Sequence, residues 1–170
     1  IRHSTAHVLA QAVLDLWPGA TYAIGPPIDH GFYYDFLLPE GATFSPEDLE
    51  AIDSRMREII ALDQLFERHE TDASGAMELF EGHPYKREII EKVSEGDGGA
   101  ELSGEAGASG VLSCYRNGDG FVDPCMGPHV PSTGRLGHFA LQKVAGAYWR
   151  GDESQPMLQR IYGTAWASKK

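Results

Sequence analysis

Residues 1–16 read IRHSTAHVLAQAVLDL, and this stretch decides how the rest of the chain is interpreted. Its apolar residues recur at offsets of three, four and seven before a Pro-Gly pair, a pattern that predicts an amphipathic helix. His3 and His7 then lie one turn apart on one helix face. Far along the chain, Cys125 and His129 have the same spacing in a segment that Gly and Pro mark as a loop. We therefore expect the fold to bring helix and loop together as one cluster of three histidines and a cysteine.

The composition limits the class of protein. The chain has 170 residues, enough for one domain with a sizeable core, and its formal net charge is −11. This charge argues against a free-standing nucleic-acid-binding protein, because contacts to phosphate need Lys and Arg. No apolar run approaches the ~20 residues that cross a bilayer, and no signal peptide is recognisable, so we expect a cytoplasmic protein with no membrane contact. In the cytoplasm, Cys114 and Cys125 are most simply interpreted as thiols.

The charge is distributed unevenly along the chain. Towards the C-terminus bases outnumber acids, with Arg135, Lys143, Arg150, Arg160, Lys169 and Lys170 against Asp152 and Glu153. We therefore expect that one end of the domain can approach an RNA held by another domain.

Short elements of both kinds follow the first helix in irregular order. Residues 31–37 predict a strand with three aromatic residues on one face, and Ser45 and Pro46 mark the start of a second helix. Residues 117–120 predict a two-residue hairpin turn. Further strands are expected at 21–24, 65–70, 111–116, 121–122, 138–148 and 157–162, and further helices at 72–82 and from residue 84. Without a repeating βαβ pattern, this order predicts an α+β fold in two layers, a largely antiparallel β-sheet with helices packed on one face.

Two segments are set apart from this fold. Residues 95–110 are rich in Gly and Glu and are expected to form a flexible insert. Residues 164–170 are expected to begin a helix that leaves the domain, so that the domain itself covers residues 1–163.

Three kinds of chemistry compete for the His and Cys cluster. A zinc protease needs the glutamate of an H-E-x-x-H motif, and Ser4 stands in its place. A cysteine protease needs a thiolate and an imidazole with a third orienting group, and spacing alone does not show that Cys125 reaches a carbonyl carbon. Two alternatives remain, a zinc site with four ligands or a metal-free polar pocket that hydrolyses a small ester. On spacing alone, core packing is the simpler interpretation of Tyr34 and solvent exposure that of Lys86.

Seven motifs extend over essentially the whole chain: HSTAH at 3–7, AIGP at 23–26, GFYYD at 31–35, PYK at 84–86, DPCMGPH at 123–129, GAYWRGD at 146–152 and MLQRIYGTAW at 157–166. Together they closely resemble the editing domain of bacterial threonyl-tRNA synthetase, an N2-type domain shared with alanyl-tRNA synthetase. The last two motifs distinguish the threonyl enzyme from the alanyl one. The resemblance implies post-transfer editing, in which the ester of mischarged seryl-tRNA(Thr) is hydrolysed.

The resemblance also implies which residues work in the site. Carried over position by position, the catalytic residues are His3, His7, Lys86, Asp123, Cys125 and His129, and the substrate-binding residue is Tyr34. In this hypothesis Lys86 and His3 position and activate the attacking water. His7 and His129 order the ester and the adenosine hydroxyls, Asp123 takes the seryl amino group, and Tyr34 and Cys125 shape the pocket wall.

Cofactors and partners follow from the same resemblance. No cofactor is favoured, and the alternative is Zn²⁺ on His3, His7, Cys125 and His129. The expected partners are the 3′ end of tRNA(Thr) carrying serine and the rest of a synthetase chain, with its catalytic and anticodon-binding domains, in an enzyme expected to be a homodimer. The alternative function is a non-catalytic, zinc-stabilised module that binds tRNA.

Overall fold

A computed structural model describes residues 1–95 and 112–168 of the chain. The helices are α1 (Arg2–Leu16), α2 (Pro46–Ala61), α3 (Ala73–Leu79) and α4 (Pro84–Ser94). The strands are β1 (Thr21–Tyr22), β2 (Pro27–Ile28), β3 (Gly31–Leu37), β4 (Phe66–Thr71), β5 (Leu112–Asn117), β6 (Phe121–Pro124), β7 (His138–Tyr148) and β8 (Met157–Trp166). Helices and antiparallel strands alternate irregularly, which confirms the predicted α+β class. No helix in the described ranges is long and apolar enough to cross a membrane.

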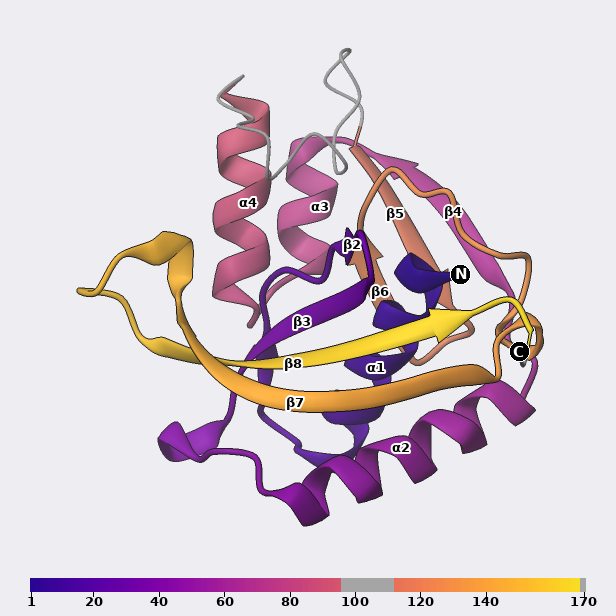
Figure 1. Cartoon of the computed structure of the whole chain (residues 1–170). Coiled ribbons are helices and arrows are strands. Elements are labelled where there is room, and N and C mark those ends of the chain that lie inside the picture. Colours follow the sequence, from indigo (N-terminus) through magenta and orange to yellow (C-terminus); the bar gives the residue numbers. More distant parts are fainter. Residues whose placement is uncertain (96–111, 169–170) are drawn as a thin grey trace.

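The larger sheet has the strand order β1-β3-β8-β7, with β2 also paired to β3, and every pairing is antiparallel. Helix α1 lies against β3 and β8 on one face, and α2 runs beside α1 (Figure 1). Phe32, Tyr34 and Phe36 of β3 point towards α1 and are fully buried, as the alternation predicts. The hydrophobic core therefore fills the space between α1, α2 and this sheet.

Helix α2 begins where the sequence predicts. The Ser45 side chain accepts a hydrogen bond from the Asp48 N–H, and the Asp48 carboxylate accepts one from the Ser45 N–H, which forms a capping box. Ile52, Met56 and Ile59 form the fully buried stripe of this helix. Local signals were sufficient here because the cap and the apolar stripe agree.

The strands do not all join one sheet. β4, β5 and β6 form a separate three-stranded antiparallel sheet, which the sequence did not distinguish from the larger one. The loop between β5 and β6 has three residues, 118–120, because Asn117 pairs with Phe121, so the predicted two-residue turn is wrong. Gly118 begins this loop with φ +54°, a conformation that favours glycine.

The predicted helix from residue 164 is also wrong. Residues 164–166 continue β8, and Trp166 pairs with His138 at the far end of β7. The backbone of Gly163 passes so close to Phe32 that an added Cβ would lie 2.4 Å from the ring. Pairing and packing with distant strands therefore decide this conformation. Of the predicted insert, only Glu95 lies within the described residues, where it ends α4.

Helix α4 lies beyond the β1 edge of the larger sheet, with α3 beside it (Figure 1). Its Tyr85 and Ile89 pack with Trp149 and Leu158 in a second, smaller apolar cluster. The predicted placement of helices on one face thus holds for α1 and α2, while α4 covers an edge. Because α4 lies at this edge, its Lys86 side chain reaches the interior next to Tyr34.

Candidate functional site

The first two turns of α1 supply one side of the site. His3 is partly buried and His7 fully buried, because α1 is enclosed from Ser4 to Val13. Their ring centroids lie 4.9 Å apart with the rings nearly perpendicular. The helix thus presents two imidazoles along one face, as the spacing predicts.

The loop after β6 supplies the other side. The His129 ring lies 4.2 Å, centroid to centroid, from both His3 and His7. The Cys125 Sγ lies 3.2 Å from the His129 Nε2. Donor atoms of His3, His7, Cys125 and His129 all fall within 4.8 Å of one another. The prediction that helix and loop form one cluster is therefore confirmed.

Ser4 ties the helix to this loop. Its hydroxyl accepts a hydrogen bond from the Val130 N–H at 3.0 Å and is hydrogen-bonded to the His129 Nδ1 at 2.9 Å. The sequence marked Ser4 only as the residue that replaces a protease glutamate, so this role was missed. A polar residue between two site histidines on a buried helix face was the available signal.

A buried ion pair lies behind the imidazoles. The Lys86 Nζ is 2.6 Å from the Asp123 Oδ1, and Lys86 also donates a hydrogen bond of 2.9 Å to the Tyr34 hydroxyl. The Tyr34 hydroxyl donates to the Asp123 Oδ2, and the His7 Nε2 lies 3.3 Å from the same oxygen. Lys86 is 0% exposed, so its interpretation as a surface lysine is wrong. A buried ammonium needs such compensation, and Asp123 and Tyr34 provide it.

Tyr34 reaches the Lys86–Asp123 ion pair because its position on β3 directs the side chain inward and because Gly25, next to its ring, has no side chain. Its ring packs on Phe36, with centroids 5.2 Å apart. A Cβ at Gly25 would come within 1.9 Å of the Tyr34 ring, so no larger residue fits there without a shift. Tyr34 therefore both packs in the core and contributes a polar group to the site.

Burial sets the protonation of the three histidines. Desolvation lowers the pKa of His3 and lowers the pKa of His7 well below 6.5, and the positive charge of Lys86 adds to both effects. The pKa of His129 is lowered by burial and then by His7 and His3. All three rings are therefore neutral at neutral pH, in the form that accepts a proton or binds a metal.

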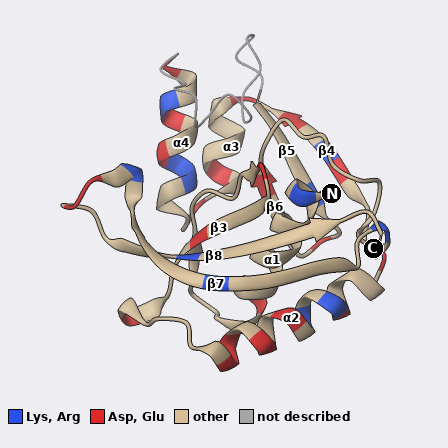
Figure 2. Ribbon diagram, viewed as in Figure 1, with Lys and Arg blue, Asp and Glu red and all other residues tan. Residues whose placement is uncertain are grey.

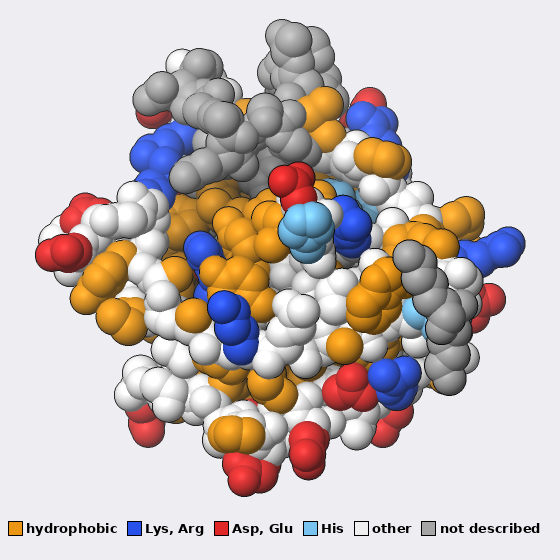
Figure 3. All heavy atoms as spheres, in the orientation of Figure 1, with side chains coloured by type: hydrophobic (Ala, Val, Ile, Leu, Met, Phe, Trp, Pro, Cys, Tyr) orange, Lys and Arg blue, Asp and Glu red, His pale blue; other side chains and the backbone are white. Residues whose placement is uncertain are grey.

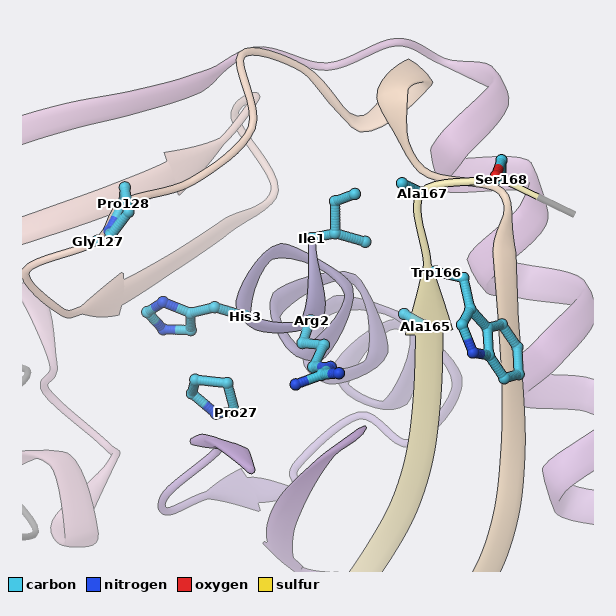
Figure 4. A pocket seen from close by; sticks show the side chains of 10 residues that line it. All are labelled: Ile1, Arg2, His3, Pro27, Gly127, Pro128, Ala165, Trp166, Ala167 and Ser168. Atoms are coloured by element: carbon cyan, nitrogen blue, oxygen red, sulfur yellow. The ribbon is translucent and has the colours of Figure 1, made fainter. Parts of the chain in front are cut away.

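A cavity of about 650 Å³ opens beside this cluster (Figure 4). Its wall is formed by Ile1, Arg2, His3, Pro27, Gly127, Pro128, Ala165, Trp166, Ala167 and Ser168. In Figure 4 the His3 ring projects from α1 towards Gly127 and Pro128. Of the seven predicted site residues His3 is part of this wall, while Lys86, Asp123 and Tyr34 lie deeper. The cavity and the buried ion pair are thus joined through the histidines.

Comparison with known proteins shows which class of domain part of this chain is similar to. Residues 112–162 match the family described as the threonyl and alanyl tRNA synthetase second additional domain. This segment contains Asp123, Cys125 and His129, the part of the site that β6 and its loop contribute.

Individual relatives extend the match to the whole chain. The chain is 55% identical over 172 residues to the threonine--tRNA ligase of Acidithiobacillus ferrooxidans (strain ATCC 53993 / BNL-5-31). It is 50% identical over 170 residues to that of Rubrobacter xylanophilus and 51% identical over 173 residues to that of Maricaulis maris. Each match covers 100% of this chain and 24% of the relative, so the chain spans about a quarter of these enzymes. The resemblance inferred from the motifs, to the editing domain of bacterial threonyl-tRNA synthetase, is confirmed.

Proposed function

We propose that this chain is the ester-hydrolysing editing domain of a threonine–tRNA ligase and removes serine from mischarged tRNA(Thr). The observation that carries the proposal is the joining of seven polar residues, from α1, β3, α4, β6 and the loop after β6, beside one cavity. The similarity to threonine–tRNA ligases supports the substrate class.

Such an enzyme needs a second site for a physical reason. Serine is threonine without one methyl group, and a missing methyl changes binding in the synthetic site by only about 1–3 kcal/mol. A separate hydrolytic pocket too small for the threonine methyl can reject the correct product and destroy the wrong one. We therefore assign to the proposed site discrimination by size together with ester hydrolysis.

His3 is the residue that we assign to the attacking water. It faces the cavity and its pKa is lowered, so that it is unprotonated and able to accept a proton at neutral pH. In the proposed step the water oxygen bonds to the ester carbonyl carbon while His3 takes a water proton. The carbon–oxygen bond to the adenosine then breaks, and the proton returns to the departing hydroxyl oxygen. The products are serine and tRNA.

The deeper residues act on the same reaction centre in this proposal. Lys86 supplies positive charge that helps to position the water, and Asp123 attracts the seryl ammonium. Since these two groups are paired with each other at 2.6 Å, the ammonium would compete with Lys86 for Asp123. His7 and His129 order the ester and the ribose hydroxyls, while Tyr34 and Cys125 form the inner wall.

The residues also fit a zinc ion, which is the alternative. Tetrahedral zinc with bonds of 2.0–2.3 Å places its ligands about 3.3–3.8 Å apart, so a cluster within 4.8 Å needs only a small contraction. His3, His7, Cys125 and His129 would hold the ion, and the Ser4 hydroxyl would orient His129. When bound by four protein ligands, zinc supplies structural stability and leaves no open position for water. We therefore favour the metal-free form for hydrolysis and connect zinc with the non-catalytic tRNA-binding alternative.

We place this activity within a longer synthetase that also carries catalytic and anticodon-binding domains, and we propose that the enzyme is a homodimer. The coverage of about a quarter of each relative supports the first point. Separation of the full polypeptide by size, with light scattering, measures the second.

The test is deacylation of seryl-tRNA(Thr) and threonyl-tRNA(Thr) in parallel, with metal content measured on the same preparation. We expect rapid loss of serine, slow loss of threonine, and a large rate decrease in His3→Ala. His69→Ala is the matched control, since His69 is exposed on β4 away from the cluster, and it should keep the wild-type rate. A wild-type protein that binds one zinc and tRNA but hydrolyses neither ester would refute the proposal and support the alternative.

A further inference from the structure

The face of the larger sheet opposite α1 carries a row of aromatic and cationic side chains. Tyr33 of β3 is the register partner of Tyr162 of β8, and Lys143 of β7 pairs with the other side of Tyr162. Arg160 lies two residues before Tyr162 and therefore on the same face. Figure 3 views this face and shows cationic side chains set among hydrophobic ones over the middle of β7 and β8.

These side chains form stacked cation–aromatic pairs. The Arg160 guanidinium lies 3.9 Å from the centroid of the Tyr33 ring, and the Lys143 Nζ lies 5.0 Å from that of the Tyr162 ring. The two tyrosine rings are 5.8 Å apart. Lys143 is exposed and both tyrosines are half-buried, so part of each ring faces outward. Flat aromatic surface beside fixed cations is the arrangement on which unpaired nucleobases stack.

The row connects two hollows of the surface. At one end, Trp166 lines the cavity that contains His3, and alternation along β8 places Trp166 on the same face as Tyr162. At the other end, Tyr33 and Arg160 line a second cavity of about 370 Å³. The adjacent residues Pro26 and Pro27 line one cavity each, so both hollows border the same short segment at the start of β2.

The charge of this face also differs from that of the whole chain. The net charge is −11, yet β7 and β8 carry cations across their middle, while acidic side chains outnumber basic ones on α2 (Figure 2). Arg160 is bound to Asp35 at 2.8 and 2.9 Å. Among the described residues, no carboxylate lies within ion-pair distance of Lys143. Lys143 is thus available to bind a phosphate. The tyrosine rings form the larger part of this face of the sheet.

We infer that this face, from Trp166 through Tyr162 and Tyr33 to Arg160, is a track for single-stranded RNA. The inference rests on the proposed function and deepens it, since the track would carry the unpaired nucleotides that precede the terminal adenosine in the His3 cavity. Trp166 lies four positions after Tyr162 along β8, a separation of about 13 Å at ~3.3 Å per residue. The rings stack on bases whatever their identity, while Lys143 contacts the backbone, so the track holds the strand without reading its sequence.

The test compares two substrates in the full polypeptide that contains this chain. Seryl-tRNA(Thr) uses both cavity and track, whereas 3′-O-seryl-adenosine uses the cavity alone. We expect Tyr162→Leu to lower the ratio of kcat/KM for seryl-tRNA to that for seryl-adenosine about 10-fold, because one base stack is lost. Tyr162→Phe, which keeps the ring, should restore most of this ratio.

Lys143→Gln tests the phosphate contact without disturbing a buried group. It should reduce the slope of log affinity against log salt by about 0.7 for a short single-stranded RNA with the 3′ sequence of tRNA. Arg57→Gln is the matched control. Arg57 lies on α2, with its guanidinium 4.5 Å from the ring of the buried Phe139 of β7, so it is away from the proposed track and its replacement should change neither measurement.

The outcomes separate the inference from the function on which it rests. If both substrates are hydrolysed and the ratio and salt slope of the Tyr162 and Lys143 variants match those of Arg57→Gln, the RNA track is refuted and the editing function stands. If neither substrate is hydrolysed, the proposed function fails, and binding of the short RNA still decides the track. If Tyr162→Leu instead lowers the stability of the full polypeptide with no change in RNA binding, the face packs against another domain and the inference is overturned.

Discussion

Replacement of Lys86 by Met should destabilise the folded chain far more than replacement of a surface lysine. Lys86 is 0% exposed, and its removal leaves the Asp123 carboxylate buried without its cationic partner at 2.6 Å. Breaking a buried ion pair from one side costs about 3–5 kcal/mol of unfolding free energy. Lys92 on the same helix pairs with Glu88 at 3.7 Å with both side chains partly exposed, so Lys92→Met should cost less than about 1 kcal/mol.

Urea unfolding followed by circular dichroism measures both free energies. The double variant Lys86→Met, Asp123→Asn should recover much of the loss, because it removes the uncompensated charge as well. If Lys86→Met were no more destabilising than Lys92→Met, the claim that the buried Lys86–Asp123 pair stabilises the fold would be refuted. Because Asp123 is itself assigned to the seryl ammonium, the double variant tests the stability of the fold and not the catalytic role of Lys86.

Three further predictions concern the histidines, Tyr34 and the cap of α2. Burial lowers the pKa of His7 and His129, so these rings bind protons more readily in the unfolded chain than in the folded one. The free energy of unfolding should therefore be highest above about pH 6.5 and fall with the pH below it, by up to about 1.4 kcal/mol per pH unit for each ring. Urea unfolding at pH 7.5 and 5.5 measures the loss, and equal stability at both values would contradict it. Gly25→Ala should lower the free energy of unfolding by about 1–3 kcal/mol and slow deacylation, because the added Cβ would displace the Tyr34 ring. A thermal scan measures the first effect and the seryl-tRNA assay the second. A variant with unchanged stability and rate would exclude this close packing. Ser45→Ala should cost about 1 kcal/mol with deacylation unchanged, and a change in that rate would mean that α2 affects the site.

Local signals predicted those parts of the fold that local chemistry determines. The helix over residues 2–16, strand β3 and the capped start of α2 all agree with the sequence pattern. Residues 164–166 were misassigned because their strand conformation depends on pairing with β7, more than twenty residues earlier. The division into two sheets was missed for the same reason, since register between distant strands is absent from periodicity.

The candidate site was predicted only in part. Matched spacing indicated the cluster of His3, His7, Cys125 and His129, but nothing in the spacing around Lys86 indicated burial. Its environment is set by Asp123, which lies on β6 and is distant in sequence, so the motif resemblance was needed to select it. Ser4 was overlooked because its partners, His129 and Val130, are 125 and 126 residues away.

The short strand β6 has a consequence for how the protein tolerates insertions. Asp123 lies in β6 and Cys125 follows its last residue, where the Cys125 N–H still bonds to the Ser113 carbonyl, so alternation directs the carboxylate and the thiol to the same side. A single residue added to the loop at 118–120 that shifted the pairing by one place would turn both groups outward together. Length variation in this hairpin should therefore be far more harmful than in the surface loops, although no residue of the hairpin tip touches the cavity.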